Sequence, residues 1–411
     1  MAKTLTFIRH AETNSNRLRT WQGNYDSGLS DTGIAQLERL AGRFVGREPS
    51  IVIASDLSRT MRTAEAITSD VAPDPAWREF HVGAWEGYTS EEIMVRFPGE
   101  MEAFFAGEDM APGGGELMSK FRSRITTAFE SLVSSLADDD EAVVVTHGGV
   151  IWALVAHVLG LTGRSVRIMP PFNTSATVVT VPDDGVPQLT VFNDAGHLDD
   201  VATHFGPSGP RVTIFRHGQT EGNVDGRWQG RSDSPLTDLG RRQAKAVTRY
   251  APDMAALFTS PLGRTRQTAA IIGDALDVEP EANEGFLEMS FGAWENLTST
   301  EAATQDPELY GEIFDRGHDL PRGGDGETFT ATGSRFADTL EGIVADTGKD
   351  LGVVSHGAAI RAFTVKVMGL AFDERNRLPV PRNTSMSSVV YSDGGPVLAS
   401  YNVAPHLEGI T

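Results

Sequence analysis

The stretch TLTFIRHAET, residues 4–13, decides the fold of this 411-residue chain. Threonines and large apolar residues fill its first half and predict a buried β-strand that ends at Arg9 and His10. Two basic residues at the end of a buried strand are either incidental to packing or the floor of an anion site. The second interpretation gains weight because RVTIFRHGQT, residues 211–220, repeats the phrase.

The repeat extends along the chain at a spacing of about 207 residues, which suits two copies of one domain and not a solenoid. The matched phrases keep their order: RHAETNSN (9–16) and RHGQTEGN (216–223), WQGNYDSGLSDTG (21–33) and WQGRSDSPLTDLG (228–240), ASDLSRTMRTAEAI (54–67) and TSPLGRTRQTAAII (259–272), EFHVGAWEG (79–87) and EMSFGAWEN (288–296), VVVTHGGVI (143–151) and GVVSHGAAI (352–360). We expect a tandem duplication with domains at 1–205 and 210–411, joined by a Gly- and Pro-containing linker at 203–210.

Short apolar runs alternate with helical patterns in each half. TLTFI, SIVIAS and AVVVTH end in polar residues, and DTGIAQLERLAGRF and SRTMRTAEAITSD carry helical spacing between them. This alternation predicts an α/β fold with a mostly parallel sheet and helices on both faces. Loops at the carboxyl ends of parallel strands form the binding crevice. Residues 9–10, 55–59 and 147–148 follow such ends, so we expect them to meet at one edge of the sheet.

Composition excludes several classes of function. The net charge of −21 argues against nucleic acid or an anionic membrane as a partner, so an anionic substrate needs a local basic pocket. The absence of cysteine excludes disulfides, thiolate metal sites and a cysteine nucleophile. No apolar run approaches the roughly 18 residues of a membrane span, and the start of the chain resembles no signal peptide. We therefore expect a cytoplasmic protein.

Two histidines stand out among ten because each ends an apolar strand and each recurs. His10 recurs as His217, and His147 recurs as His356. His147 also precedes a Gly-Gly pair and an apolar helix, whose N-terminus favours an anion. Histidines kept only for packing would not explain the arginine beside the first of them.

Arginines accompany these histidines. Arg9 and Arg216 precede the first histidine of each half, and Arg59 and Arg264 open the helix after the second strand. A guanidinium binds phosphate with two hydrogen bonds and never loses its charge. Surface pairing or snorkelling is the alternative for any single arginine. Two arginines and two histidines that converge would form a phosphoryl pocket.

Glu79 and Glu288 precede the apolar phrases VGAW and FGAW. A carboxyl group beside apolar residues is a candidate general acid, whereas a surface glutamate at a turn is the alternative. Neutral imidazole attacks phosphorus near pH 7 without a further base. The chemistry therefore needs no metal or other cofactor, and the sequence contains no cluster at metal-ligand spacing.

Together, the RHG-type start, the SPLGRTRQTA phrase, the GAWE phrase and the later THG or SHG resemble the histidine phosphatase superfamily, also called phosphoglycerate mutase-like. The resemblance covers almost the whole chain, twice. It implies in each domain a mixed sheet flanked by helices, with a helical cap inserted at about 88–118 and 297–327. It also implies hydrolysis of small phosphate monoesters through phosphohistidine.

The resemblance assigns roles to single residues. His10 and His217 would be the nucleophiles, and Glu79 and Glu288 the proton donors. Residues that would clamp or orient the phosphoryl group are Arg9, Asn16, Gln22, Arg59 and His147 in the first half, and Arg216, Asn223, Gln229, Arg264 and His356 in the second.

The halves also depart from the family and from each other. Ala11 replaces the glycine that usually follows the first histidine, which would crowd the phosphate slightly. Four cationic or titratable residues of the first half are neutral or small in the second: Arg17, Arg19, Arg62 and His81 against Val224, Gly226, Gln267 and Ser290. Either the first site is tuned to a more anionic ligand, or these surface residues have drifted.

Three functions remain open. The leading one is a tandem phosphatase for a small-molecule phosphate ester, and the second is a mutase, although by resemblance mutases carry a longer insert and a characteristic tail. The third makes one half a silent regulatory or dimerisation module. The sequence is compatible with a homo-oligomer. The aromatic residues of the cap would either contact the organic part of the substrate or pack against one another within the cap. They are Phe97, Phe104, Phe105, Tyr310 and Phe314.

Overall fold

The opening stretch forms β1, at the centre of a mixed sheet in the N-terminal half. In this computed structural model, which describes residues 2–161, 166–183, 185–198 and 209–410, the strands lie in the order β3-β2-β4-β1-β5-β6. β1 is parallel to β4 and antiparallel to β5, which alone among these six strands runs against the others. The strands are β1 (Lys3–Arg9), β2 (Ile51–Ala54), β3 (Ala72–Pro73), β4 (Glu141–Thr146), β5 (Ala176–Val181) and β6 (Gln188–Asp194).

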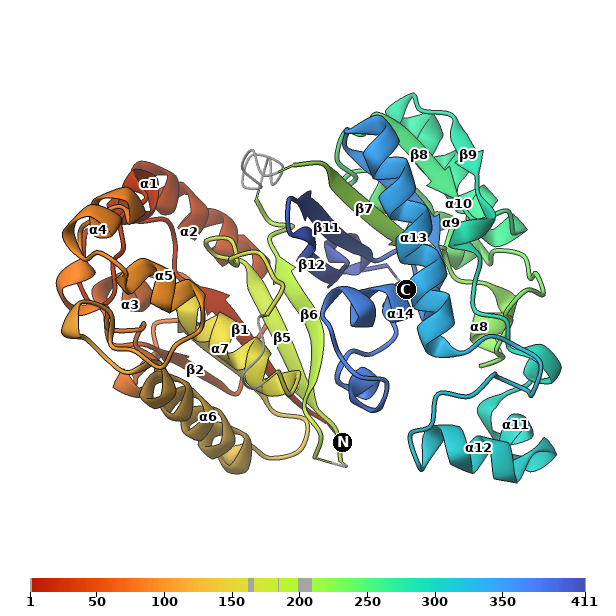
Figure 1. Cartoon of the computed structure of the whole chain (residues 1–411), viewed down its shortest axis with the longest axis horizontal. Coiled ribbons are helices and arrows are strands. Elements are labelled where there is room, and N and C mark those ends of the chain that lie inside the picture. Colours follow the sequence, from red (N-terminus) through yellow and green to blue (C-terminus); the bar gives the residue numbers. More distant parts are fainter. Residues whose placement is uncertain (1, 162–165, 184, 199–208, 411) are drawn as a thin grey trace. The chain divides into compact units, whose positions relative to one another are not determined.

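The C-terminal half repeats this sheet with β7 in the place of β1. Its order is β9-β8-β10-β7-β11-β12, and β7 is parallel to β10 and antiparallel to β11. The expected α/β architecture with a mostly parallel mixed sheet is therefore confirmed in both halves (Figure 1). The strands are β7 (Arg211–Arg216), β8 (Ala256–Thr259), β9 (Pro280–Ala282), β10 (Leu351–Ser355), β11 (Met386–Ser392) and β12 (Gly395–Val403).

Helices follow the strands in the same sequence in each half. In the first they are α1 (Asn14–Leu18), α2 (Asp31–Arg43), α3 (Ser58–Ala64), α4 (Ser90–Arg96), α5 (Glu100–Phe105), α6 (Met118–Ser135) and α7 (Gly148–Val158). In the second they are α8 (Glu221–Val224), α9 (Asp238–Val247), α10 (Gly263–Leu276), α11 (Ser299–Gln305), α12 (Pro307–Phe314), α13 (Phe329–Thr347) and α14 (Gly357–Val367). Helices α4 and α5, and likewise α11 and α12, form the expected cap inserts.

One helix is shorter than its spacing predicts. The pattern indicates a helix over 58–70, but α3 ends at Ala64, whereas its counterpart α10 continues for 14 residues. Glu79 follows Ser55 by 24 positions, and Glu288 follows Ser260 by 28. The whole segment is thus four residues shorter in the first unit, whereas the helix itself is seven residues shorter, which is about two turns.

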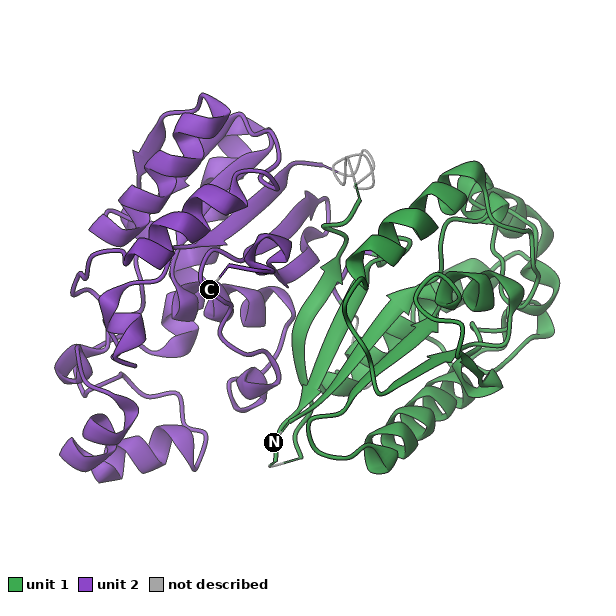
Figure 2. Cartoon of the chain, turned by 180° about the vertical axis from the view of Figure 1, so that it is seen from behind, with its two compact units in different colours: residues 1–166, 170–201 green, residues 167–169, 202–411 purple. Residues whose placement is uncertain are grey.

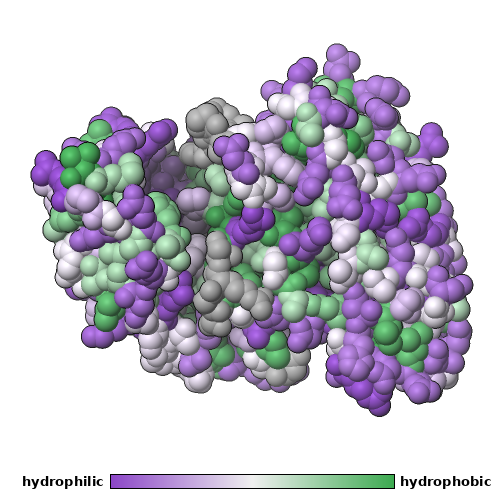
Figure 3. All heavy atoms as spheres, in the orientation of Figure 1, coloured by the Kyte–Doolittle hydropathy of each residue, from purple (hydrophilic) through white to green (hydrophobic). Residues whose placement is uncertain are grey.

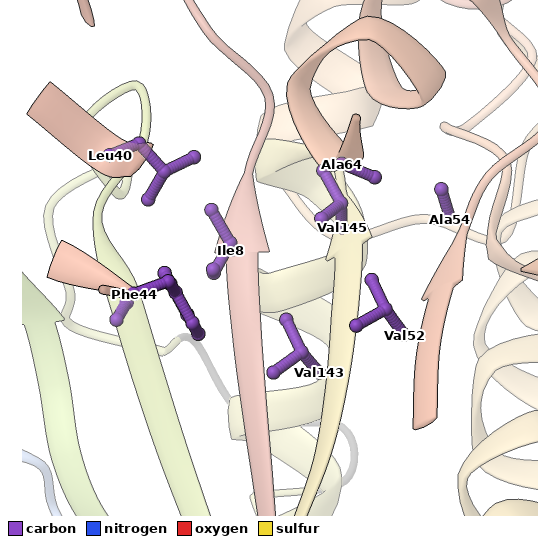
Figure 4. Packing of buried hydrophobic residues seen from close by; sticks show 9 residues of the cluster. Ile8, Leu40, Phe44, Val52, Ala54, Ala64, Val143 and Val145 are labelled. Carbon is purple, nitrogen blue, oxygen red and sulfur yellow. The ribbon is translucent and has the colours of Figure 1, made fainter. Parts of the chain in front are cut away.

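The core of the first unit lies on both faces of β1, whose apolar residues Leu5, Phe7 and Ile8 are fully buried. Ile8 faces one side and packs with Leu40 of α2, with Phe44 directly after this helix, and with Val143 and Val145 of β4 (Figure 4). Phe7 faces the other side, where its ring lies 6.4 Å from that of Phe129 in α6. A strand covered twice cannot shift register without exposing one set of side chains, so the position of His10 at its end is fixed.

The chain forms two compact units, residues 1–166 with 170–201 and residues 167–169 with 202–411 (Figure 2). The linker expected at 203–210 falls mainly on residues 203–208, which lie outside the described residues. Hydrophilic side chains cover much of the visible surface of each unit (Figure 3). Among the described helices, none combines the length and the apolar character needed to cross a membrane.

Candidate functional site

The first histidine of each unit directly follows the central strand and is buried. Nδ1 of His10 lies 2.8 Å from the carbonyl oxygen of Ala11, and Nδ1 of His217 lies 2.7 Å from that of Gly218. Because a carbonyl oxygen only accepts, Nδ1 must carry the ring proton. The lone pair of the neutral ring is therefore on Nε2, the nitrogen available to a substrate.

The surroundings keep these two rings neutral. Burial, with the charges of Arg59 and Arg9, holds the pKa of His10 well below its ordinary value of 6.5. Burial and the charges of Arg216 and Arg264 lower the pKa of His217 in the same way. A neutral imidazole is the nucleophilic form, so both histidines are ready to attack at neutral pH.

The second histidine of each unit faces the first from the N-cap position of a helix. His147 precedes α7 and His356 precedes α14. The ring centroids of His10 and His147 lie 5.2 Å apart, and those of His217 and His356 lie 5.3 Å apart. Residues more than 130 positions apart are thus brought together at one sheet edge, as expected from the ends of parallel strands.

The arginine before His10 and the arginine before His217 each make one hydrogen bond and leave another donor unused. Nη1 of Arg9 donates to the carbonyl oxygen of Pro171 over 2.6 Å, and Nη1 of Arg216 donates to that of Pro381 over 2.6 Å. The Nε of each is buried and finds no acceptor among the described residues. A buried unsatisfied donor is costly, and an anion bound beside it supplies the missing acceptor.

The second arginine of each unit donates hydrogen bonds to backbone carbonyl groups of the loop that follows α1 or α8. Arg59 donates from Nη2 to the carbonyl oxygen of Gly23 over 2.6 Å and from Nη1 to that of Tyr25 over 2.9 Å. Arg264 makes the matching bonds to Gly230 and Ser232, over 2.8 and 2.7 Å. Burial lowers the pKa of Arg59 to about 10, so its guanidinium stays charged at neutral pH.

The glutamates are fixed at the N-terminus of the helix that follows the second histidine. Oε2 of Glu79 accepts the backbone N–H of Gly149 over 3.0 Å. The carboxylate of Glu288 accepts the N–H groups of Ala358 and Ala359 over 3.1 and 2.8 Å. Both carboxyl groups therefore lie beside the histidine pair, where a leaving group would need a proton.

The expected polar residues join the same cluster. The carbonyl oxygens of Asn16 and Asn223 accept all the hydrogen bonds that their side chains make within the described residues, which leaves the amide hydrogens for a ligand. Gln22 accepts from Oγ1 of Thr13 over 3.0 Å, and Gln229 donates to Oγ1 of Thr220 over 2.8 Å. These threonines are the N-caps of α1 and α8, so the glutamines hold the helices that carry the asparagines.

Some residues of the site are absent from the sequence-based prediction. Asn173 donates from Nδ2 to the carbonyl oxygen of His10 over 2.8 Å and to Oδ1 of Asn16 over 3.2 Å. Asn383 repeats both contacts in the second unit. Oγ1 of Thr63 accepts the N–H of Ala11 over 3.0 Å, as Thr268 does for Gly218. The available signal was the recurrence of NTS at 173–175 and 383–385 and of threonine in the two short-helix phrases.

The structure shows where the residues that differ between the two halves lie. A Cβ built on Gly218 would lie 2.5 Å from the carbonyl oxygen of Gly240 in α9, so a methyl group at this position points toward that helix. The extra cations of the first half are exposed: Arg17, Arg19, Arg62 and His81. Neither feature makes the buried part of the first site more cationic.

The cap aromatics contact one another. Phe104 lies 5.4 Å from Trp21 and 5.8 Å from Trp85, ring centre to ring centre, and Tyr310 lies 4.5 Å from Phe314. Phe105 is 72% exposed. In the described ranges, no group of three or more His, Asp or Glu side chains is arranged to hold a metal ion.

Known proteins share this sequence pattern. The sequence model of the histidine phosphatase superfamily (branch 1) matches residues 5–195 and 212–404. The chain is 33% identical over 205 residues to phosphoglycerate mutase-like protein 4 of Arabidopsis thaliana, which covers 48% of this chain and 87% of that protein. It is 34% identical over 169 residues to a glucosyl-3-phosphoglycerate phosphatase of Mycolicibacterium vanbaalenii, covering 39% and 75%. A solved phosphoserine phosphatase of Entamoeba histolytica in complex with 3-phosphoglyceric acid is 28% identical, with 48% and 99% covered and a TM-score of 0.45.

Proposed function

Because the chain belongs to the histidine phosphatase superfamily, we propose that each of its units hydrolyses small phosphate monoesters through a phosphohistidine, without a metal. The observation that carries the proposal is the Nδ1–H bond of His10 to its neighbouring carbonyl, which leaves Nε2 as a buried, neutral nucleophile beside two arginines with unpaired Nε donors. His217 makes the matching bond, and burial lowers its pKa in the same direction, which supports a second active site.

In the first step, Nε2 of His10 forms a bond to phosphorus while the bond from phosphorus to the ester oxygen breaks. Arg9, Arg59 and His147 stabilise the charge on the three equatorial oxygens. Glu79 gives a proton to the departing alkoxide. This proton transfer is typically worth about 100- to 10,000-fold in rate.

In the second step, water attacks the phosphoryl group and the bond between phosphorus and Nε2 breaks. Glu79, now ionised, takes the proton from the water. His10 returns to its neutral form with the proton still on Nδ1, because the carbonyl of Ala11 holds it there throughout. The products are an alcohol and inorganic phosphate, and every proton is accounted for.

The alternatives remain a mutase and a chain with one silent unit. A relative named as mutase-like keeps the first alternative, since transfer from phosphohistidine to a second hydroxyl uses the same residues. Both units retain their histidines, arginines and glutamate, which favours two working sites. We propose a small-molecule ester as the partner, with no role for nucleic acid or membrane, because the chain is acidic. We also propose a cytoplasmic location. A homo-oligomer also remains part of this proposal.

Three variants test the proposal: His10→Ala, His217→Ala and the double variant, each assayed for phosphate release from a panel of esters. Each single variant should retain the activity of the other unit, and the double variant should lose nearly all activity. Acid-labile phosphate trapped on the protein should need the same histidines. Phosphate release by the double variant at the wild-type rate would overturn the proposal, and transfer of the trapped group to a second hydroxyl in place of water would establish the mutase.

A further inference from the structure

We call Arg216, His217, Arg264 and His356 the phosphate cradle of the second unit. One of the differences between the two sites lies beside it. Arg231 of the second unit stands where the first unit has Asn24, in the matched phrases WQGR and WQGN. Its neighbours in the chain, Gly230 and Ser232, are the residues whose carbonyl oxygens hold the guanidinium of Arg264. Arg231 therefore lies in the wall of the cradle itself.

The side chain of Arg231 reaches from this wall toward the cap. Its Nη2 donates to Oε2 of Glu327 over 3.0 Å, at the end of the cap insert. The same carboxylate oxygen accepts the N–H of Ser290, two residues after the proton donor Glu288. The ester oxygen of a substrate must face Glu288, so the organic part of that substrate leaves the cradle beside Arg231.

Arg231 has a side-chain donor, Nε, that makes no hydrogen bond to the residues that the structure describes. Its Nε is buried and has no acceptor within the described part of the chain. Glu327 is already bound by Nε and Nη2 of Arg335, over 2.9 and 3.0 Å, so Arg231 is a second guanidinium on a carboxylate that one arginine already neutralises. Glu295 accepts the backbone N–H of Arg231 over 3.0 Å. Burial holds the pKa of His356 well below 6.5, and the nearby charge of Arg231 adds to this shift.

The first unit has one guanidinium fewer at this place, while Glu86 accepts the backbone N–H of Asn24 as Glu295 does that of Arg231. Glu116, the counterpart of Glu327, pairs with Arg124 alone among the described arginines, over 2.8 Å, which leaves a neutral pair. Asn24 has a buried Oδ1 without a donor. A neutral amide in this place offers no counter-charge to a second anionic group.

We propose that Arg231 forms a second anion subsite, so that the second unit prefers phosphate esters bearing a carboxylate or another anionic group near the ester oxygen, whereas the first unit does not. This inference rests on the proposed function of the second site. The planar guanidinium, with an unpaired Nε beside the leaving-group path, suits two hydrogen bonds to a carboxylate.

The test compares matched ester pairs: phosphoglycolate with 2-hydroxyethyl phosphate, and 3-phosphoglycerate with glycerol 3-phosphate. In the His10→Ala protein, kcat/KM should favour the carboxylate ester, and Arg231→Asn should lower that preference about 10-fold, mainly through KM. Arg231→Lys should restore part of it. In the His217→Ala protein the preference should be small, and Asn24→Arg should raise it.

Arg227→Asn is the matched control, because it removes an exposed guanidinium from the same segment that pairs with Glu301. It should leave the preference unchanged. The proposal is overturned if Arg231→Asn keeps the preference, or if both units favour the carboxylate esters equally. Failure of the proposed function is seen separately, as phosphate release that survives loss of both His10 and His217.

Discussion

Arg264 donates the hydrogen of its Nε to Nδ1 of His356 over 3.2 Å. This bond fixes the tautomer of His356, whose Nε2–H must then donate to Oγ of Ser260 over 2.8 Å. In the first unit the matching atoms, Nε of Arg59 and Nδ1 of His147, are buried and lack partners among the described residues. The second unit therefore holds His356 with two bonds, and the first holds His147 with one.

Loss of the serine hydroxyl should consequently affect the two sites unequally. Ser55→Ala removes the one side-chain bond of His147, 2.9 Å long, whereas Ser260→Ala leaves His356 bonded to Arg264. One such bond is worth about 0.5–1.5 kcal/mol. We expect kcat/KM to fall about 10-fold at the first site and about 3-fold at the second. The sites are measured separately in His217→Ala and His10→Ala proteins, and equal losses would contradict the asymmetry.

Gly149 should be required for the position of the proton donor in the first unit. A Cβ at this residue would lie 2.3 Å from Oε1 of Glu79, so Gly149→Ala must displace the carboxyl group. We expect kcat for alkyl phosphates to fall at least about 10-fold, within the range for loss of general acid catalysis. Esters with acidic phenol leaving groups, which need little protonation, should be affected much less.

The control for this substitution is already present in the chain. Ala358 occupies the matching position of the second unit, where Glu288 accepts its backbone N–H over 3.1 Å. Ala358→Gly should therefore change kcat little. A uniform loss at the first site for alkyl and phenyl esters alike would show that Gly149 matters for folding and not for proton transfer.

The buried histidines should make the protein less stable in mild acid. Burial lowers the pKa of His10, His147, His217 and His356 below 6.5, so the unfolded chain binds more protons than the folded one as the pH falls through 6.5. Each contributes a loss of up to about 1.4 kcal/mol per pH unit in the free energy of unfolding. The midpoints of urea unfolding at pH 7.5 and 5.5 measure this effect. The variant with both His10→Asn and His217→Asn should show a smaller difference, and an unchanged difference would contradict the assignment.

Thr63 should stabilise the turn that carries the nucleophile. Its buried hydroxyl accepts the N–H of Ala11 over 3.0 Å and donates to the carbonyl oxygen of Arg59 over 2.6 Å. Thr63→Val leaves a buried N–H without a partner, at a cost of about 1–3 kcal/mol in the free energy of unfolding. Thr63→Ser keeps the hydroxyl and serves as the control. Urea denaturation of both variants checks the prediction, and equal destabilisation by the two would contradict a role for the hydroxyl.

The sequence predicts the strand ends of this site well, because parallel strands bring their carboxyl ends to one edge. Arg9 and His10 needed only the repeated phrase to be recognised, and the structure brings them together with Arg59 and His147. The contacts of Asn173 and Thr63 were not predictable, since short polar side chains bond to backbone groups whose positions depend on loops distant in sequence. The same applies to Arg231: its difference from Asn24 is visible in the sequence, but its place beside the cradle follows from the carbonyl groups on either side of it.

The carbonyl that orients each nucleophilic ring belongs to the main chain, and this has a consequence for how the two copies diverge. The residue that supplies it is alanine in one copy and glycine in the other, yet the bonds to Nδ1 measure 2.8 and 2.7 Å. No side-chain substitution removes such an acceptor. The two domains can therefore differ in the residues around this histidine, as at Asn24 and Arg231, while the backbone they share fixes the same ring tautomer in both.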